Sequence, residues 1–152
     1  MISRRVVSAF GLIAMSLGLS VALVSAQSPS QAPSRGNSRD GGWTIPASGA
    51  DAKNPLTVNE SVVAAGKKLF ASKCQRCHGP QAKGDGPDAP KGHTNDMNLT
   101  VATRAARNTD GVVFYKIWNG RATPKMPRFS EELSKDQAWA IVAYVQTLRA
   151  KE

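Results

Sequence analysis

The chain has 152 residues and a mass of 16.1 kDa, with 41% hydrophobic residues, 20% charged residues and a formal net charge of +9. This size and composition fit one soluble domain with a tail, and two cysteines are too few for a small protein held together by disulfides. Because only 6% of the residues are aromatic, we expect a core that is small or is completed by something other than side chains.

The first 26 residues have the pattern of an export signal. Arg4 and Arg5 supply a positive start, residues 6–24 are uncharged and mostly apolar, and residues 24–26 (Val-Ser-Ala) offer the small side chains that signal peptidase requires. We predict a cleaved signal peptide over 1–26. The alternative is an uncleaved membrane anchor, because the apolar stretch is just long enough to span a bilayer.

Residues 27–42 are rich in Ser, Pro, Gly, Gln and Asn, a composition typical of a disordered tether. Trp43 follows, and the chain shows no helical or alternating period up to residue 56. A tryptophan in such a stretch indicates docking across the surface of a neighbouring domain. We therefore predict a flexible tether and docking segment over 27–56, followed by a folded domain over 57–152.

The charge of the chain indicates what kind of partner it meets. Two of the 20 basic residues lie in the signal, which leaves 18 against 11 acidic residues. No run of Lys and Arg exceeds two residues, and an exported protein meets little nucleic acid, so we expect no nucleic-acid partner. An acidic protein surface or an anionic membrane face fits the positive charge better.

The domain opens with an amphipathic helix. The sequence Thr-Val-Asn-Glu from Thr57 to Glu60 is a capping box in which the Thr57 hydroxyl is expected to cap the helix. Behind it, apolar residues including Gly66 and Phe70 fall on one helical face up to about Lys73.

Two further helices are predicted in the second half of the domain. One spans 109–118 and is stopped by Asn-Gly at 119–120. The other opens at a second capping box, Ser134 to Gln137, and continues through Ala150. Residues 94–108 could hold one more short helix, and no strand pattern of any length appears. The predicted fold class is all-α, with three or more helices joined by long loops.

Both cysteines and one of the two histidines fall within five residues, Cys74-Gln75-Arg76-Cys77-His78. This is the pattern for covalent attachment of a c-type haem: two cysteines three positions apart form thioethers with the two vinyl groups, and the next residue places its imidazole under the iron. The long loop that follows is rich in Gly, Pro and polar residues, which fits a chain wrapped around a bound group.

Three other interpretations of the same motif stay open at this point. A redox-active dithiol would need an α/β surround, which the chain lacks. A zinc site would need a fourth ligand, for which His93 is the candidate. A plain disulfide would leave the adjacent His78 without a role.

With this motif, residues 57–151 resemble the class I monohaem c-type cytochromes, which in bacteria are exported and His/Met-ligated. The matching residues are Gly66 to Phe70, Cys74 to His78, Gly120, Met126 to Phe129, Leu133, Trp139 and Tyr144. The resemblance implies a small cytochrome c fold wrapped around one covalently attached haem c. It also implies that the first and last helices cross closely, for which the small Gly66 and an aromatic residue on each helix are suited.

The sixth iron ligand implied by the resemblance is Met126. Pro124 and Pro127 bracket this residue and hold its loop extended, which suits a weak thioether bond that needs a pre-positioned sulfur. Met97 and His93 remain as alternatives.

The fifth ligand is His78, whose second ring N–H is expected to donate to a carbonyl. In the family this carbonyl belongs to a proline after a Gly-rich loop. The stretch 84–87 resembles that loop, so we choose Pro87, with Pro90 as the alternative. Candidates for contacts with the propionates are Arg104, Tyr115, Trp118 and Arg121.

An iron with both axial positions filled has no open site for a substrate and passes single electrons. We therefore predict a periplasmic one-electron carrier that is not an enzyme. The alternative is a fixed haem c subunit of a larger periplasmic dehydrogenase or oxidase, with 27–56 binding the partner. An uncleaved signal would tether either form to the membrane.

The expected partners are redox proteins with acidic docking faces. Basic side chains flank both the haem motif and Met126: Lys73, Arg76, Lys83, Lys91, Arg121, Lys125 and Arg128. In the resembled fold these two loops surround the exposed haem edge, so this set of seven residues, the basic ring, would steer such a partner to it.

Overall fold

The computed structural model describes residues 42–123 and 125–149, so the predicted signal peptide, the tether up to residue 41 and Pro124 lie outside the described residues. The helices in chain order are α1 (Ala47–Ala50), α2 (Glu60–Lys73), α3 (Gln75–His78), α4 (Thr94–Met97), the 3-10 helix η1 (Ala102–Arg107), α5 (Asp110–Asn119) and α6 (Lys135–Arg149). The described residues form no strand, only two isolated bridges, which confirms the all-α fold class. None of the helices in this part of the chain is long and apolar enough to cross a membrane.

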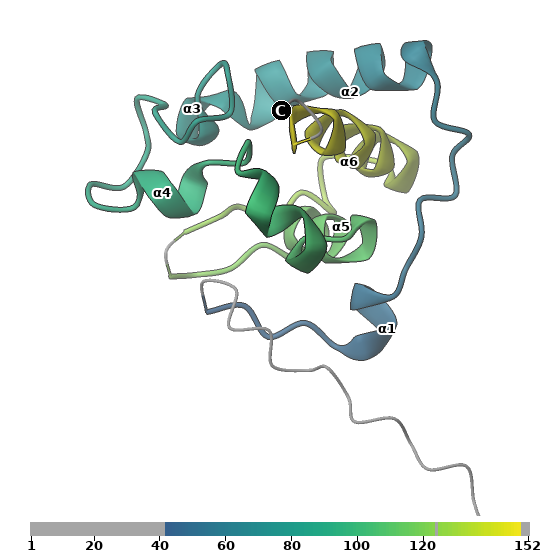
Figure 1. Ribbon diagram of the computed structural model, residues 1–152, viewed down its shortest axis with the longest axis horizontal. Coiled ribbons are helices and arrows are strands. Elements are labelled where there is room, and N and C mark those ends of the chain that lie inside the picture. Colours follow the sequence, from purple (N-terminus) through teal and green to yellow (C-terminus); the bar gives the residue numbers. More distant parts are fainter. Residues whose placement is uncertain (1–41, 124, 150–152) are drawn as a thin grey trace, which may run out of the picture. The chain divides into compact units, whose positions relative to one another are not determined.

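The two longest helices, α2 and α6, lie against one another (Figure 1). Their closest approach is at Gly66, where an added Cβ would overlap the backbone oxygen of Ala140. One turn further on, the rings of Phe70 and Tyr144 meet edge to face with their centroids 5.4 Å apart. The predicted close crossing, with a glycine and an aromatic residue on each helix, is confirmed.

The cap of α2 differs from the prediction. Asn59 rather than Thr57 is the N-cap, and its Oδ1 accepts from the Val62 amide at 3.0 Å. Thr and Asn are both good N-cap residues, and these two lie only two positions apart, so the sequence alone did not indicate which of them caps the helix. The second capping box is confirmed: the Gln137 amide donates to the Ser134 hydroxyl, and the Ser134 amide donates to Gln137 Oε1.

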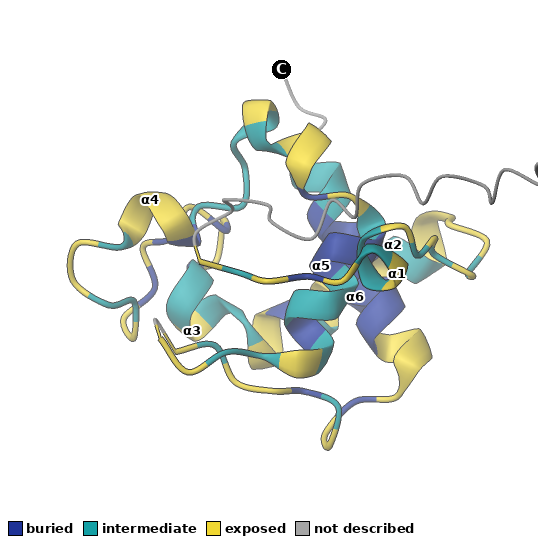
Figure 2. Cartoon of the chain, turned by 90° about the horizontal axis from the view of Figure 1, so that it is seen from below, coloured by how far each residue is buried: buried dark blue, intermediate teal, exposed yellow. Residues whose placement is uncertain are grey.

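The core lies between α2, α5 and α6, and the buried stretches of α5 and α6 are dark blue in Figure 2. Three aromatic side chains stack through it: Phe114 lies 4.1 Å from Trp139 and 5.5 Å from Trp118, centroid to centroid, with nearly parallel planes. α5 ends at Gly120, which adopts φ +60 and closes the helix as predicted.

Residues 42–56, where docking was predicted, pack on the helical domain. Ile45 is only 1% exposed, and the Thr109 hydroxyl donates to the Ala50 carbonyl at 2.9 Å. Near the other end, the Asn54 side chain donates to the Trp139 carbonyl at 3.1 Å. The segment therefore runs along the outside of α5 and reaches α6, with the single turn α1 in its middle.

Candidate functional site

The two cysteines lie at the junction of α2 and α3. Cys74 caps both helices, and α3 is one helical turn that carries Cys77 and His78. Burial, with a smaller contribution from the neighbouring Cys77, raises the pKa of the Cys74 thiol to about 12. A redox-active dithiol needs a thiolate near neutral pH, so this environment does not fit that alternative.

The imidazole of His78 is held from behind by a backbone carbonyl. Its Nδ1 lies 2.8 Å from the oxygen of Met97, which as a carbonyl can only accept, so Nδ1 carries the proton and Nε2 has a free lone pair. Burial lowers the pKa of His78, while the Met97 hydrogen bond opposes that shift. His78 is therefore a neutral imidazole in the tautomer that binds metals through Nε2.

The carbonyl that holds His78 was predicted to be that of Pro87, and the structure differs. The Gly-rich loop instead packs on the backbone of α3: an added Cβ at Gly86 would overlap the Arg76 carbonyl, and the Asp88 amide donates to the same carbonyl at 2.8 Å. Pro87 is exposed there. It is therefore not the acceptor for the ring.

The Met97 carbonyl reaches His78 because two loop segments pair. The Gly84 amide donates to the His78 carbonyl, and the Leu99 amide donates to the Ala82 carbonyl, each at 2.8 Å. Gly84 adopts φ +80, and an added Cβ would overlap the Thr94 carbonyl. Nothing in the local sequence around Met97 indicates its contact with His78, which lies 19 positions away.

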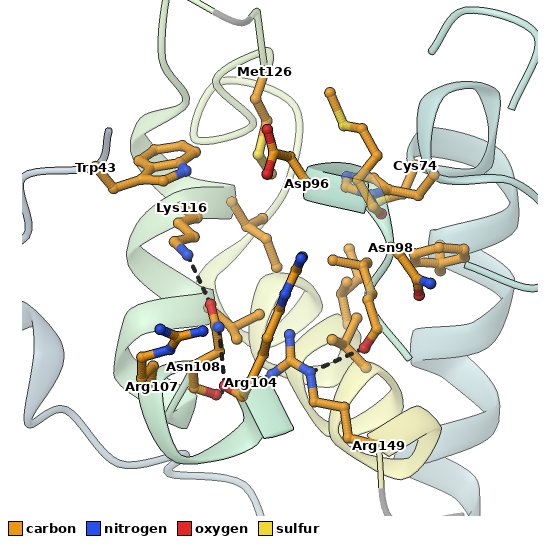
Figure 3. Close-up of a pocket in the computed structure, with 18 of the residues that line it drawn as sticks. Trp43, Cys74, Asp96, Asn98, Arg104, Arg107, Asn108, Lys116, Met126 and Arg149 are labelled. Carbon is orange, nitrogen blue, oxygen red and sulfur yellow. Dashed lines mark hydrogen bonds between the residues drawn. The ribbon is translucent and has the colours of Figure 1, made fainter. Parts of the chain in front are cut away.

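His78 faces a cavity of about 250 Å³ (Figure 3), much larger than the packing voids of a protein interior. Cys74 and Met126 also line it, and its apolar wall comes from α2, α5 and α6: Phe70, Val113, Ile117, Ile141 and Val145. A smaller cavity of about 60 Å³ is lined by Cys77 and shares Cys74, His78, Met97 and Met126 with the first.

This donor set fits a covalently attached haem. Both cysteines, His78 and Met126 line the smaller cavity, and all of them except Cys77 also line the larger one, so the two attachment points and two candidate iron ligands gather at one place. His93 does not line either cavity; it is half-exposed and pairs with Asp96 at 3.2 Å. Within residues 42–123 and 125–149 no three His, Cys, Asp or Glu side chains gather as a metal site, so the zinc alternative fails.

Met126 is fixed by backbone pairing. Its amide and carbonyl exchange hydrogen bonds of 3.0 and 2.9 Å with those of Arg121, forming an isolated bridge. Next to it, an added Cβ at Gly120 would lie 2.6 Å from both the Met126 oxygen and the Arg128 nitrogen. Prolines were expected to supply the rigidity; Pro124 lies outside the described residues, and the bridge was not foreseen.

The rim of the larger cavity is strongly basic. Its charged lining residues are Asp96, Arg104, Arg107, Lys116, Arg121 and Arg149. Arg149 is 7% exposed and donates to the carbonyls of Leu99 and Asn108, each at 3.0 Å, while Lys116 donates to the Asn108 side chain at 2.7 Å (Figure 3).

Of the four residues expected near the propionates, Arg104 and Arg121 line the cavity. Trp118 instead stacks on Phe114, and neither Trp118 nor Tyr115 is a lining residue. Lys116, Arg149 and Trp43 line the cavity without having been predicted. They come from three distant segments, so only the folded chain brings them together.

The basic ring is partly neutralised. Lys73 pairs with Glu132 at 2.6 Å, Arg76 with Asp88 at 2.8 Å and Arg128 with Glu131 at 3.6 Å. In contrast, Lys83, Lys91 and Lys125 are exposed and have no ion pair in the part of the chain that the structure describes. Lys125 lines the smaller cavity together with Cys77.

The family model described as Cytochrome c matches residues 63–149, more than half of the chain. No curated protein matches. Among solved structures, the chain is similar to one in the "Kuenenia stuttgartiensis reducing HAO-like protein complex Kustc0457/Kustc0458", with 29% sequence identity and a TM-score of 0.51. That match covers 64% of this chain and 49% of the other, so this chain accounts for about half the length of the solved one.

Proposed function

The chain belongs to the cytochrome c family, and we propose that it is a periplasmic one-electron carrier with a single haem c, ligated by His78 and Met126. Family membership implies a covalently bound haem and a role in electron transfer. The observation that carries the finer proposal is the pair of backbone restraints on one cavity: the carbonyl that fixes His78, and the bridge that fixes Met126.

Met126 is a better sixth ligand than Met97 for a geometric reason. The Met97 carbonyl binds Nδ1, so the Met97 backbone lies behind the imidazole, away from the nitrogen that takes the iron. Met97 also lines both cavities, but its backbone is held on the Nδ1 side of the ring, so its side chain starts on the side opposite to Nε2. Met126 comes from a different loop that also borders both cavities.

When bound, the haem supplies the one-electron Fe(III)/Fe(II) couple. His78 contributes a neutral imidazole in a fixed tautomer, and Met126 contributes a thioether held by its backbone. Apolar side chains of α2, α5 and α6 line one wall of the larger cavity. If His78 and Met126 both bound the iron, no coordination site would be left for a substrate, which supports a carrier rather than an enzyme.

Replacing each methionine tests the ligand assignment. We expect Met126→Ala to keep covalent haem but to lose the low-spin spectrum, lower the reduction potential and let the ferrous protein bind CO at neutral pH. Met97→Leu is the matched control, because it removes a thioether but keeps the carbonyl that holds His78. The proposal is wrong if Met97→Leu opens the iron to CO and Met126→Ala does not.

A fixed subunit of a larger redox complex is the second candidate function. The solved neighbour belongs to a complex of HAO-like proteins, which favours it. Against it, Trp43 to Asn54 already packs on this domain, so that part of the segment proposed to bind a partner is occupied. Purification of the native protein decides: a single species supports the carrier, and stable co-purification with an enzyme supports the subunit.

For either function we propose that redox partners dock through acidic faces onto Lys83 and Lys125. Both lysines are exposed and have no ion pair among the described residues, and cations of this kind steer such partners, raising association rates by about 10–10³-fold. We expect Lys83→Glu with Lys125→Glu to slow second-order electron transfer with the native partner at low ionic strength, and salt to shrink the deficit. Lys67→Glu with Lys68→Glu, on the exposed face of α2, is the charge-matched control. Equal rates for both pairs at every salt concentration would contradict docking at this site.

A further inference from the structure

Trp43 lines the cavity and lies beside Lys116, another of its lining residues (Figure 3). The centroid of its indole ring is 5.6 Å from Lys116 Nζ and 4.7 Å from Arg121 Cζ. Both distances are in the range of cation–π attraction. The ring is thus shared between two positive side chains that also line the cavity.

The indole is anchored by the segment that carries it. Two residues further on, Ile45 is only 1% exposed, so the segment that carries Trp43 is packed on the domain. The carbonyl of Ala50 accepts from Thr109 at the start of α5, the helix that contains Lys116. Trp43 therefore belongs to the same packed unit as the two cations, rather than to the tether before it.

Positive charge is concentrated around Lys116 and Arg121. The larger cavity is lined by five basic residues and one acidic residue, so like charges repel each other around its rim. Lys116 also donates to Asn108 Oδ1 at 2.7 Å, which holds it from one side. An aromatic face attracts both cations at once and covers them from water, which keeps them near the cavity despite their mutual repulsion.

We infer that Trp43 is a positioning residue of the haem pocket, which holds Lys116 and Arg121 at the cavity wall and thereby raises the reduction potential. This rests on the haem of the proposed function, but not on which residue is its sixth ligand. Reduction adds one negative charge to the pocket, so cations fixed at its wall favour the reduced state. Shielding by the indole strengthens that effect, because water would otherwise screen it and stabilise the more charged oxidised state.

The test compares the midpoint potentials of three variants of the haem-loaded full chain. We expect Trp43→Ala to lower the ratio of reduced to oxidised protein at a fixed solution potential by threefold or more, about 28 mV for a one-electron couple. Covalent haem and the low-spin spectrum should be retained. Trp43→Phe should recover most of the potential because it restores an aromatic face, and Thr44→Ala, at an exposed neighbouring position, should equal the wild type.

A double-mutant cycle identifies the residues through which Trp43 acts. In a Lys116→Gln, Arg121→Gln background, Trp43→Ala should change the potential little, because the cations it positions are gone. The same background tests the inference if Trp43→Ala alone does not fold, since it should itself lower the potential.

The inference is overturned by an unchanged potential in a low-spin Trp43→Ala protein, or by a full additional shift in the Lys116→Gln, Arg121→Gln background. It is also overturned if Trp43→Phe is as low as Trp43→Ala. A wild-type protein that lacks the low-spin spectrum would instead overturn the proposed ligation, and the two failures are thus distinguishable.

Discussion

Replacing Gly120 by alanine should release Met126 without unfolding the domain. Gly120 has φ +60 and ψ −174, a region essentially restricted to glycine, so an alanine there costs about 1–3 kcal/mol. Its Cβ would also lie 2.6–2.7 Å from backbone atoms of Met126, Pro127 and Arg128. Overpacking of this kind costs about 1–3 kcal/mol more. The total, roughly 2–6 kcal/mol, is a large part of the stability of a small domain.

This strain can be relieved locally. The atoms that an alanine at position 120 would contact belong to the Met126 loop. Among the described residues, the backbone of this loop is held by the bridge to Arg121 and by the hydrogen bond from the Phe129 amide to the Ile117 carbonyl at 3.1 Å. Breaking the bridge moves the loop away and frees the new methyl group. We therefore expect Gly120→Ala to keep covalent haem and helical structure, and to bind CO in the ferrous state at neutral pH.

The assay combines thermal unfolding with CO binding, and Gly92→Ala is the control. Gly92 has φ +82, but an added Cβ there would meet nothing within 4 Å. This variant therefore isolates the backbone cost of about 1 kcal/mol, which for a domain of this size lowers Tm by about 4–8 °C. Gly120→Ala should lower Tm at least twice as much, and it alone should bind CO. Equal losses of Tm with no CO binding in either variant would refute the argument.

Two further substitutions test the framework around the site. Gly66→Ala forces a methyl group into the α2–α6 crossing. It should lower the free energy of unfolding by about 2 kcal/mol in chemical denaturation, after a gain of about 1 kcal/mol from helix propensity is included. Lys67→Ala, on the exposed face of α2, is the control and should stay within about 0.5 kcal/mol of the wild type. Cys74→Ser with Cys77→Ser should abolish covalent haem and leave a chain without a cooperative thermal transition, because the cavity wall has nothing to pack against; a cooperatively melting apo domain would contradict this.

The long helices were predictable because their signals are local. α2 ends at Lys73 as expected, and α6 opens at the capping box that the sequence displays. The error at the start of α2 is also local: Asn59 and Thr57 are both good caps, and which one is used depends on how the chain enters from Leu56. Periodicity cannot detect α1 and α3, since a single helical turn has no period.

The site was most predictable where its chemistry is contiguous in sequence. Cys74, Cys77 and His78 fall in one motif, so the chain itself keeps them close together. The carbonyl that binds the imidazole lies far away in the sequence, and choosing Pro87 by the composition of its loop was wrong because that loop packs on α3 instead. The Met97 carbonyl carries no side-chain signature, and a backbone acceptor can be assigned only once the two loop segments are known to pair.

Several contacts that sequence reasoning missed join the cavity wall to a distant segment. Arg149 at the end of α6 binds the carbonyl of Leu99, which in turn lies beside the residue that holds His78. Trp43 meets Lys116 and Arg121 from the other side of the cavity. These contacts form only when the chain is folded around the space they enclose, so filling that space and ordering the loops are coupled events. A group attached at the cysteines therefore stabilises the loops between α3 and α5 as well as carrying the electron. These loops are long because they must surround that group.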